Sequence, residues 1–577
     1  MSYITSPTYT GPNRVTCSPG YPTTTTCKLL VATLYNPTSD LVTVVVNGVS
    51  YVSGTDFTLR ARGSNICWTE VLTGTGLSAL TRYPWSVSQE ASGTNYSDSG
   101  SLLTAAESGD DFTILFAGCD NNTHFTNQIN SNPWKVPGAW QHYRTYAENS
   151  ANLPVAGVLF VDDLGYVDGQ AIDESGSAGT GTYDFPGITG LVCSNSPATS
   201  GALDDYIIGW CAIFGMLGPS QSTFTDAELV DTSLLRVLWG REENRAWCRK
   251  NLNVFPQWGD HEFMNDMGWD NQPGGATINQ WTNGKLSWGY FYGAIQPPLT
   301  GVSVARDAIA NHWAFKIGDV VIASLDGVTN ASRTWGSPAT VAVGNSAALT
   351  QFTTVYGNNQ IDDILEAVNT LAGRYTILPL AHSIRYLTAR TGAAPHLTFA
   401  AAVSESNYGA QHPIFDHCIA NYQRIFTATG ATPKSLMDNP VTNGTTGNLL
   451  LLHGDFHHGQ VLYHNHAAYT GNAAENFYAV HLGTTNGSSN FPVPEEGATG
   501  ASVADIYVEY QSPATSVNSM FWGAFLEVQD SARWLEVTYT DRDNTSLWNK
   551  KFMRNGGNYA FDVTWEFPSI TGLARLK

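Results

Sequence analysis

The stretch LLHGDFHHGQV, residues 451–461, places one carboxylate and two adjacent imidazoles directly after an apolar run. Four consecutive leucines before the glycine are typical of a buried strand. Asp455, His457 and His458 follow almost at once. These side chains are suited to an ordinary polar loop, and they are also common metal ligands. A metal site would need further ligands from other parts of the chain.

Three other apolar runs end in the same way. The ligand-type residues are Cys119 and Asp120 after DFTILFAG, Asp162, Asp163 and Tyr166 after LPVAGVLFV, and Asp260, His261, Glu262 and Asn265 after NVFPQWG. In layered α/β folds the carboxyl ends of strands converge on one crevice where ligands bind. A single ending of this kind is usually a turn or a helix cap. Four such endings together predict one shared metal site.

The remaining sequence divides into two parts. Residues 1–106 predict an all-β domain, because short β-rich runs alternate with Gly, Ser, Thr and Asn clusters. In residues 107–577 strands alternate with helical patterns, which predicts a layered α/β core. The stretch 361–373 has the spacing of an amphipathic helix, and the apolar run 207–217 predicts a buried helix. The alternation in 520–541 predicts antiparallel strands that close the domain.

Composition limits the possible partners. Of the 577 residues 13% are charged, about half the usual share of roughly 25%. The net charge is −21, which argues against nucleic acid as the main partner. Phosphate esters remain possible substrates, because bound cations can invert the local field. A surface rich in Ser, Thr, Asn and Gly is common in extracellular, cell-surface and virion proteins, so we expect one of these locations.

We expect neither a signal peptide nor a membrane-spanning segment in this sequence. Its N-terminus lacks the charged and apolar regions of a signal peptide, and its longest apolar run is too short to span a bilayer. Eight cysteines are too few for a disulfide scaffold. Cys17 and Cys27 are candidates for one bridge that closes a small N-terminal loop.

In their order, the four endings resemble the motifs of the metallophosphoesterases, specifically the PhoD-like alkaline phosphatase and phosphodiesterase branch. The superfamily pattern is D-x-H, G-D, G-N-H-E and G-H-x-H. In the PhoD-like branch a cysteine replaces the first motif, and the others read D-x-x-Y, W-D-D-H-E-x-x-N and G-D-x-H. The matching residues here are Cys119, then Asp163 and Tyr166, then WGDHEFMN with Asn265, and finally Asp455 and His457.

This resemblance implies an α/β fold with a layered β-sandwich core flanked by helices, after an immunoglobulin- or fibronectin-like N-terminal domain. It also implies ferric iron and calcium as cofactors. A thiolate and a phenolate suit high-valent iron, and carboxylate and amide oxygens suit calcium. Donor chemistry alone also permits zinc or manganese. The metal ligands implied by the resemblance are Cys119, Asp163, Tyr166, Asn265, Asp455 and His457.

Three positions depart from the family pattern. Asp162 stands where the family has glycine, so either Asp162 or Asp163 could be the ligand, and the D-x-x-Y spacing favours Asp163. Gly259 replaces the first aspartate of W-D-D-H-E. The arginine of the family's L-D-x-R motif is absent after Asp326, which leaves the corresponding phosphate contact without a residue.

The resulting prediction is metal-dependent hydrolysis of phosphate monoesters or diesters by a metal-activated water. His261 is the candidate proton donor, with Asp260 beside it; His261 could instead orient a ligand. The expected substrate is a small phosphate ester or a phosphate-containing surface polymer. The alternative is a structural or receptor-binding protein of a virion or cell surface that carries a degenerate core. The six intact ligand positions favour the enzyme.

Overall fold

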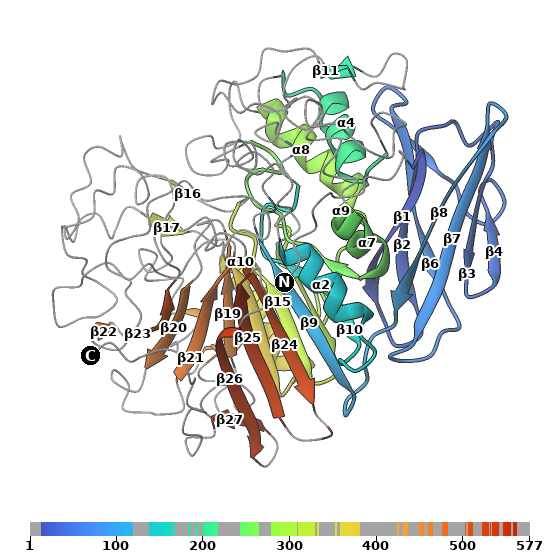
Figure 1. Ribbon diagram of the computed structural model, residues 1–577. Coiled ribbons are helices and arrows are strands. Elements are labelled where there is room, and N and C mark those ends of the chain that lie inside the picture. The colour runs from blue at the N-terminus through green and yellow to red at the C-terminus, as the bar shows by residue number, and fades with distance from the viewer. Residues whose placement is uncertain are drawn as a thin grey trace, which may run out of the picture.

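The computed structural model describes residues 13–118, 120, 138–165, 167, 183–184, 192–193, 200–216, 243–264, 278–307, 310–328, 332–333, 352–354, 358–380, 424–425, 431–436, 449–454, 460–465, 476–482, 502–503, 506–511, 522–529, 531, 534–541, 546–555 and 558–561. Their strands form a pair of small N-terminal sheets and a pair of larger core sheets (Figure 1).

Two four-stranded antiparallel sheets form the N-terminal sandwich, residues 15–103, drawn in blue in Figure 1. Their orders are β1-β2-β6-β5 and β4-β3-β7-β8. Valines 42, 44 and 46 alternate inward along β3, and Asn47 and Gly48, both with positive φ, make the turn into β4. The predicted all-β architecture is confirmed. The strands are β1 (Val15–Pro22), β2 (Cys27–Thr33), β3 (Val42–Val46), β4 (Val49–Val52), β5 (Arg60–Arg62), β6 (Cys67–Gly74), β7 (Arg82–Ala91) and β8 (Thr94–Leu103).

The candidate bridge between Cys17 and Cys27 is not formed. Both cysteines are buried and free. Cys17 lies opposite Val31 in the β1–β2 register, whereas Cys27 lies opposite Pro22. The two thiols are therefore separated along the strands, and both serve as core residues of the sandwich.

The first core sheet has seven strands in the order β13-β10-β9-β24-β25-β26-β27. The strands β9, β10 and β13 are parallel neighbours, and β24 joins β9 in the antiparallel sense. The predicted antiparallel pair near the C-terminus is β24 and β25. The bounds are β9 (Asp111–Ala117), β10 (Val155–Phe160), β13 (Val254–Phe255), β24 (Trp522–Gln529), β25 (Trp534–Asp541), β26 (Ser546–Asn555) and β27 (Asn558–Phe561).

The second core sheet has eight strands in the order β14-β15-β18-β19-β21-β20-β23-β22, with β15, β18, β19 and β21 parallel. Its strands are β14 (Trp313–Ile317), β15 (Val320–Ser324), β18 (Tyr375–Leu380), β19 (Leu449–His453), β20 (Gln460–Asn465), β21 (Asn476–His481), β22 (Ser502–Val503) and β23 (Ile506–Gln511). Two short pairs complete the strands: β11 (Tyr183–Asp184) with β12 (Val192–Cys193), and β16 (Ser332–Arg333) with β17 (Phe352–Thr354).

The two core sheets pack face to face, and helices cover their outer faces. Side chains of β9 and β10 meet those of β15 and β19 in one apolar cluster. The leucine run of β19 is continuous because Leu450 and Leu452 enter this cluster, while Leu449 and Leu451 face the opposite side. The predicted layered α/β sandwich is confirmed.

Six helices lie within the described residues, and five of them occupy the side of the first core sheet that faces the N-terminal sandwich (Figure 1). These are α2 (Gly138–Glu148), α4 (Leu203–Ile213), α7 (Glu243–Asn251), α8 (Ile278–Tyr290) and α9 (Tyr292–Ile295). The sixth, α10 (Asn358–Leu371), covers the second sheet. The predicted helices at 207–217 and 361–373 correspond to α4 and α10, each beginning a few residues earlier than expected.

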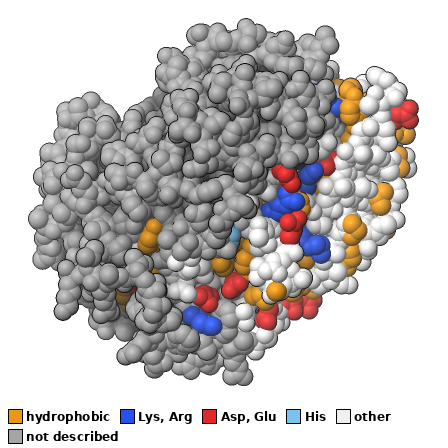
Figure 2. Space-filling view, in the orientation of Figure 1, with side chains coloured by type: hydrophobic (Ala, Val, Ile, Leu, Met, Phe, Trp, Pro, Cys, Tyr) orange, Lys and Arg blue, Asp and Glu red, His pale blue; other side chains and the backbone are white. Residues whose placement is uncertain are grey.

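Among these helices, none has the length and apolarity that a bilayer crossing requires. On the described part of the face in Figure 2, basic and acidic side chains stand beside one another instead of forming a patch of one sign. That surface does not offer the extended basic stripe that a nucleic-acid backbone requires.

Buried His142 on α2 should make stability depend on pH. Its side chain packs against Phe525, and burial lowers its pKa from 6.5 to about 4. The unfolded chain takes up this proton below about pH 6.5, whereas the folded protein does so only near pH 4. As the pH is lowered from about 6.5 to about 4, the free energy of unfolding should therefore fall, with this group contributing about 3 kcal/mol. Urea titrations at several pH values should show that His142→Leu loses this part of the decline. An unchanged profile in the variant would contradict the assignment.

Candidate metal centre

The segments that follow β9, β10 and β19 meet at one point in the fold. A Cβ atom placed on Gly454 would lie 2.1 Å from the carboxyl carbon of Asp162, and one placed on Gly118 would lie 3.1 Å from its Oδ1. The Asp162 carboxyl group therefore fills the space between the residues that precede Cys119 and Asp455. Glycine at position 454 is needed because any larger side chain would overlap this carboxyl group.

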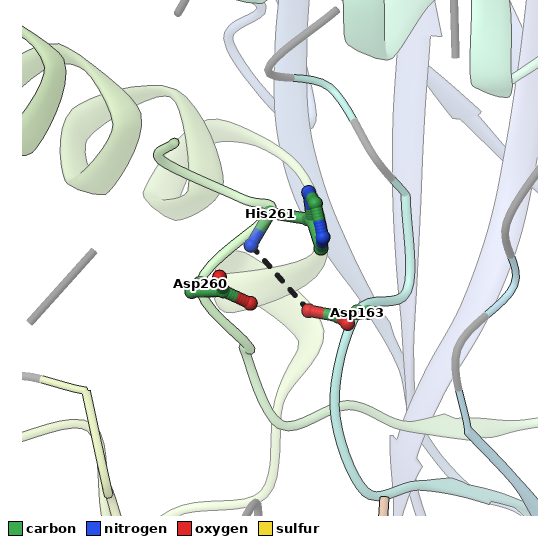
Figure 3. A group of neighbouring side chains, drawn as sticks. All are labelled: Asp163, Asp260 and His261. Carbon is green, nitrogen blue, oxygen red and sulfur yellow. Dashed lines mark hydrogen bonds between the residues drawn. The ribbon is translucent and has the colours of Figure 1, made fainter. Parts of the chain in front are cut away.

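Asp163, Asp260 and His261 form a group that could hold a metal ion. One potential ligand atom from each lies within 4.8 Å of the others, and all three residues are buried. Asp163 comes from the loop after β10, and the other two come from the turn after β13 (Figure 3). The backbone N–H of His261 donates to Oδ1 of Asp163 at 3.4 Å, shown as a dashed line in Figure 3. These are three of the candidate residues expected from the sequence.

The backbone at Asp163 directs its side chain into this group. Its φ of 40° lies in the left-handed region, which few non-glycine residues adopt. The carboxylate then occupies the space beside Gly259, where a Cβ atom would lie 2.0 Å from Oδ1 of Asp163. The departure from the family pattern at position 259 thus has a physical reason: the Asp163 carboxylate fills the place of a side chain at that position.

The charges of the group favour a bound cation. Burial raises the pKa of Asp163 well above its usual value; nearby His261 opposes this, and the carboxyls of Asp260 and Asp162 add to it. Buried carboxylates are costly unless they are paired or coordinate a metal. Several carboxylate oxygens and one imidazole also form a donor set suited to a multivalent ion. The residues present therefore fit a metal ion, as the motif resemblance implied.

Glu262 connects the two loops that carry this group. Its Oε1 accepts the N–H of Gly165 at 2.9 Å, and its Oε2 accepts the N–H of Gly259 at 2.7 Å. The side chain is fully buried, which raises its pKa to about 7 although both amide contacts oppose the shift. The carboxyl group thereby holds the loops after β10 and β13 in one relative position.

Asp326 stands where the motif resemblance places the aspartate of L-D-x-R. Its carboxylate holds the turn after β13 in place. It is fully buried and accepts the indole N–H of Trp258 at 2.9 Å and the backbone N–H of Asn311 at 2.6 Å. Trp258 directly precedes Gly259 and Asp260. The carboxylate therefore fixes the start of the WGDHE segment.

The other proposed ligands, namely Cys119, Tyr166, Asn265, Asp455 and His457, lie outside the described residues. The supporting roles of Glu262 and Asp326 were not identified from the sequence. The sequence does contain a pattern that could have identified each of them. Glu262 directly follows Asp260 and His261, and Asp326 directly follows an apolar strand.

No protein-family model matches the chain, and no curated protein matches it either. Among solved structures, the fold of this chain is similar to the structure of PhoD. The TM-score is 0.57 at 12% identity, and the match covers 97% of this chain and 94% of that chain. A purple acid phosphatase, PPD1, isolated from yellow lupin (Lupinus luteus) seeds, gives a TM-score of 0.49 at 10% identity, covering 95% of this chain and 75% of that one.

The chain thus has a layered fold similar to that of PhoD. The resemblance to the PhoD-like branch is confirmed for the fold, over almost the whole length of both chains. At this level of identity the likeness concerns the fold, so the activity must be argued from the site.

Proposed function

We propose that the protein is a metal-dependent phosphoric ester hydrolase of the PhoD-like kind. The observation that carries this proposal is the buried group of Asp163, Asp260 and His261, located where the ends of strands from both core sheets meet. A crevice at strand ends is where open α/β sheets bind their ligands.

The metal ions in this proposal are ferric iron and calcium, with zinc or manganese as alternatives. The ligands would be Cys119, Asp163, Tyr166, Asn265, Asp455 and His457. When bound, such a pair neutralises the charge of a phosphate ester and lowers the pKa of a water molecule for in-line attack. An acidic chain can thereby bind an anionic substrate.

The remaining site residues would handle the proton and the geometry. His261 lies beside the Asp163 and Asp260 carboxylates and would donate a proton to the departing oxygen. Glu262 and Asp326 keep the turn after β13 in a fixed position, so little reorganisation is needed when the ester binds.

The substrate in this proposal is a small phosphate ester or a phosphate-containing surface polymer outside the cytoplasm, at a cell surface or on a virion. The low share of charged residues, 13%, supports such a location. The same composition also favours a second candidate, a surface or virion structural protein with a degenerate core.

The test combines metal analysis with turnover. We expect the purified protein to contain iron and calcium, and to hydrolyse 4-nitrophenyl phosphate or bis(4-nitrophenyl) phosphate. Removal of the metals by a chelator should abolish hydrolysis, and their return should restore it. The preferred ester would separate monoesterase from diesterase. Bound metal without turnover of either ester would favour the structural protein, and absence of metal binding would contradict the site.

A further inference from the structure

A buried ion pair joins the segment after β9 to helix α7. The guanidinium Nη2 of Arg245, on α7, is 2.6 Å from Oδ2 of Asp120, and both side chains are almost fully buried. The indole N–H of Trp140, on α2, donates to Oδ1 of the same carboxylate at 3.2 Å. Asp120 is not a member of the Asp163–Asp260–His261 group. Its carboxylate faces the helices.

The backbone of Asp120 joins the loop after β9 to the loop after β10. Its N–H donates to the carbonyl oxygen of Asp163 at 3.0 Å. Asp120 also directly follows Cys119, the proposed thiolate ligand. A displacement of Asp120 would therefore alter the backbone contact that holds the segment after β9 against Asp163.

The helix that carries Arg245 is itself fixed by the N-terminal sandwich. Near the end of α7, Nη1 of Arg249 donates to Oγ1 of Thr16 at 3.2 Å, and Lys250 pairs with Asp98 at 2.9 Å. The hydroxyl of Ser18 donates to the carbonyl oxygen of Arg249 at 3.1 Å. Arg245 therefore projects towards Asp120 from a helix that is held in place at its other end.

The surroundings leave little room for water to hydrate the two charges. A cavity of about 20 Å³ lies beside it, lined in part by Trp140, Cys248 and Tyr292. This volume holds about one water molecule. Charges in such a confined place interact more strongly than they do at the surface, so the pair should fix the position of Asp120 firmly.

We propose that Arg245 is a positioning residue for the metal centre: through its buried pair with Asp120, it holds the loop after β9 against the loop after β10. This inference rests on the proposed function, because it assumes that both loops supply metal ligands. Residues that support metal ligands in this way typically contribute a factor of about 10–100 to metal affinity.

The experiment measures the affinities of the full-length, metal-free protein for ferric iron and for calcium, each by competition with a chelator. Arg245→Met should weaken affinity about 10–100-fold, and Arg245→Lys, which keeps the charge, should recover part of the loss. The matched control is Arg60→Met, since Arg60 lies on β5 of the N-terminal sandwich and pairs with Glu70 at the surface. This control should bind metal as the wild type does.

A double variant separates positioning from folding. Arg245→Met combined with Asp120→Asn removes both charges, so its thermal stability should be close to that of the wild type. We expect its metal affinity to remain reduced. Recovery of metal affinity together with stability would show that the pair serves folding alone, as would wild-type affinity in Arg245→Met. If Arg245→Met does not fold, Arg245→Lys and the double variant decide the question. A wild type that binds no metal would instead contradict the proposed function.

Discussion

Asp163→Ala is expected to abolish phosphate ester hydrolysis and to lower the amount of bound metal. The carboxylate of Asp163 belongs to the buried group with Asp260 and His261, and its backbone is held in a conformation that directs it there. Loss of a residue that merely supports a ligand costs about 10–100-fold. Loss of Asp163 should exceed this range. Turnover of a chromogenic ester and metal analysis would measure both effects.

The neighbouring aspartate provides the comparison. Asp162 lies against Gly118 and Gly454 and is not a member of that group. Asp162→Ala should therefore have the smaller effect, within the range of a supporting residue. Full activity in Asp163→Ala together with loss in Asp162→Ala would show that the two roles are reversed.

Gly259→Asp should also destroy the site, although it makes the sequence more similar to the family pattern. A Cβ atom at this position would lie 2.0 Å from Oδ1 and 2.6 Å from the backbone nitrogen of Asp163. The new side chain must displace Asp163 or shift the backbone of residue 259. That shift would break the hydrogen bond from the N–H of residue 259 to Glu262. We expect more than about a hundredfold loss of metal affinity, again beyond the range of a supporting residue.

A matched control for this substitution is Gly289→Asp on α8, where a Cβ atom would meet nothing within 4 Å. It introduces the same side chain and charge without a clash, so metal affinity should not change. Wild-type affinity in Gly259→Asp would mean that Asp163 takes a different position from the one described.

The sequence predicted the parts of the fold that depend on local pattern. Alternate leucines of β19, the apolar face of α10 and the alternation of β24 and β25 all carry a periodicity that burial imposes. It predicted the convergence of strand endings because parallel strands place their carboxyl ends at one edge.

Other features depend on contacts that no local pattern encodes. Arg245 and Asp120 are far apart in the sequence and form their ion pair only when α7 packs beside Asp120. The left-handed φ of Asp163 is a backbone conformation that the apolar pattern before it does not predict. The candidate cysteine bridge is absent because the β1–β2 register places Cys17 opposite Val31 and Cys27 opposite Pro22.

The attachment of α7 to the N-terminal sandwich limits how this architecture can change during evolution. Several buried polar partners of the helix, including Thr16, Ser18 and Asp98, belong to the first hundred residues. A domain joined by a flexible linker can be exchanged or lost without consequence for its neighbour. Here an exchange would have to preserve these partners, because the same helix reaches the loops of the site. We therefore expect the two parts to be inherited as one unit.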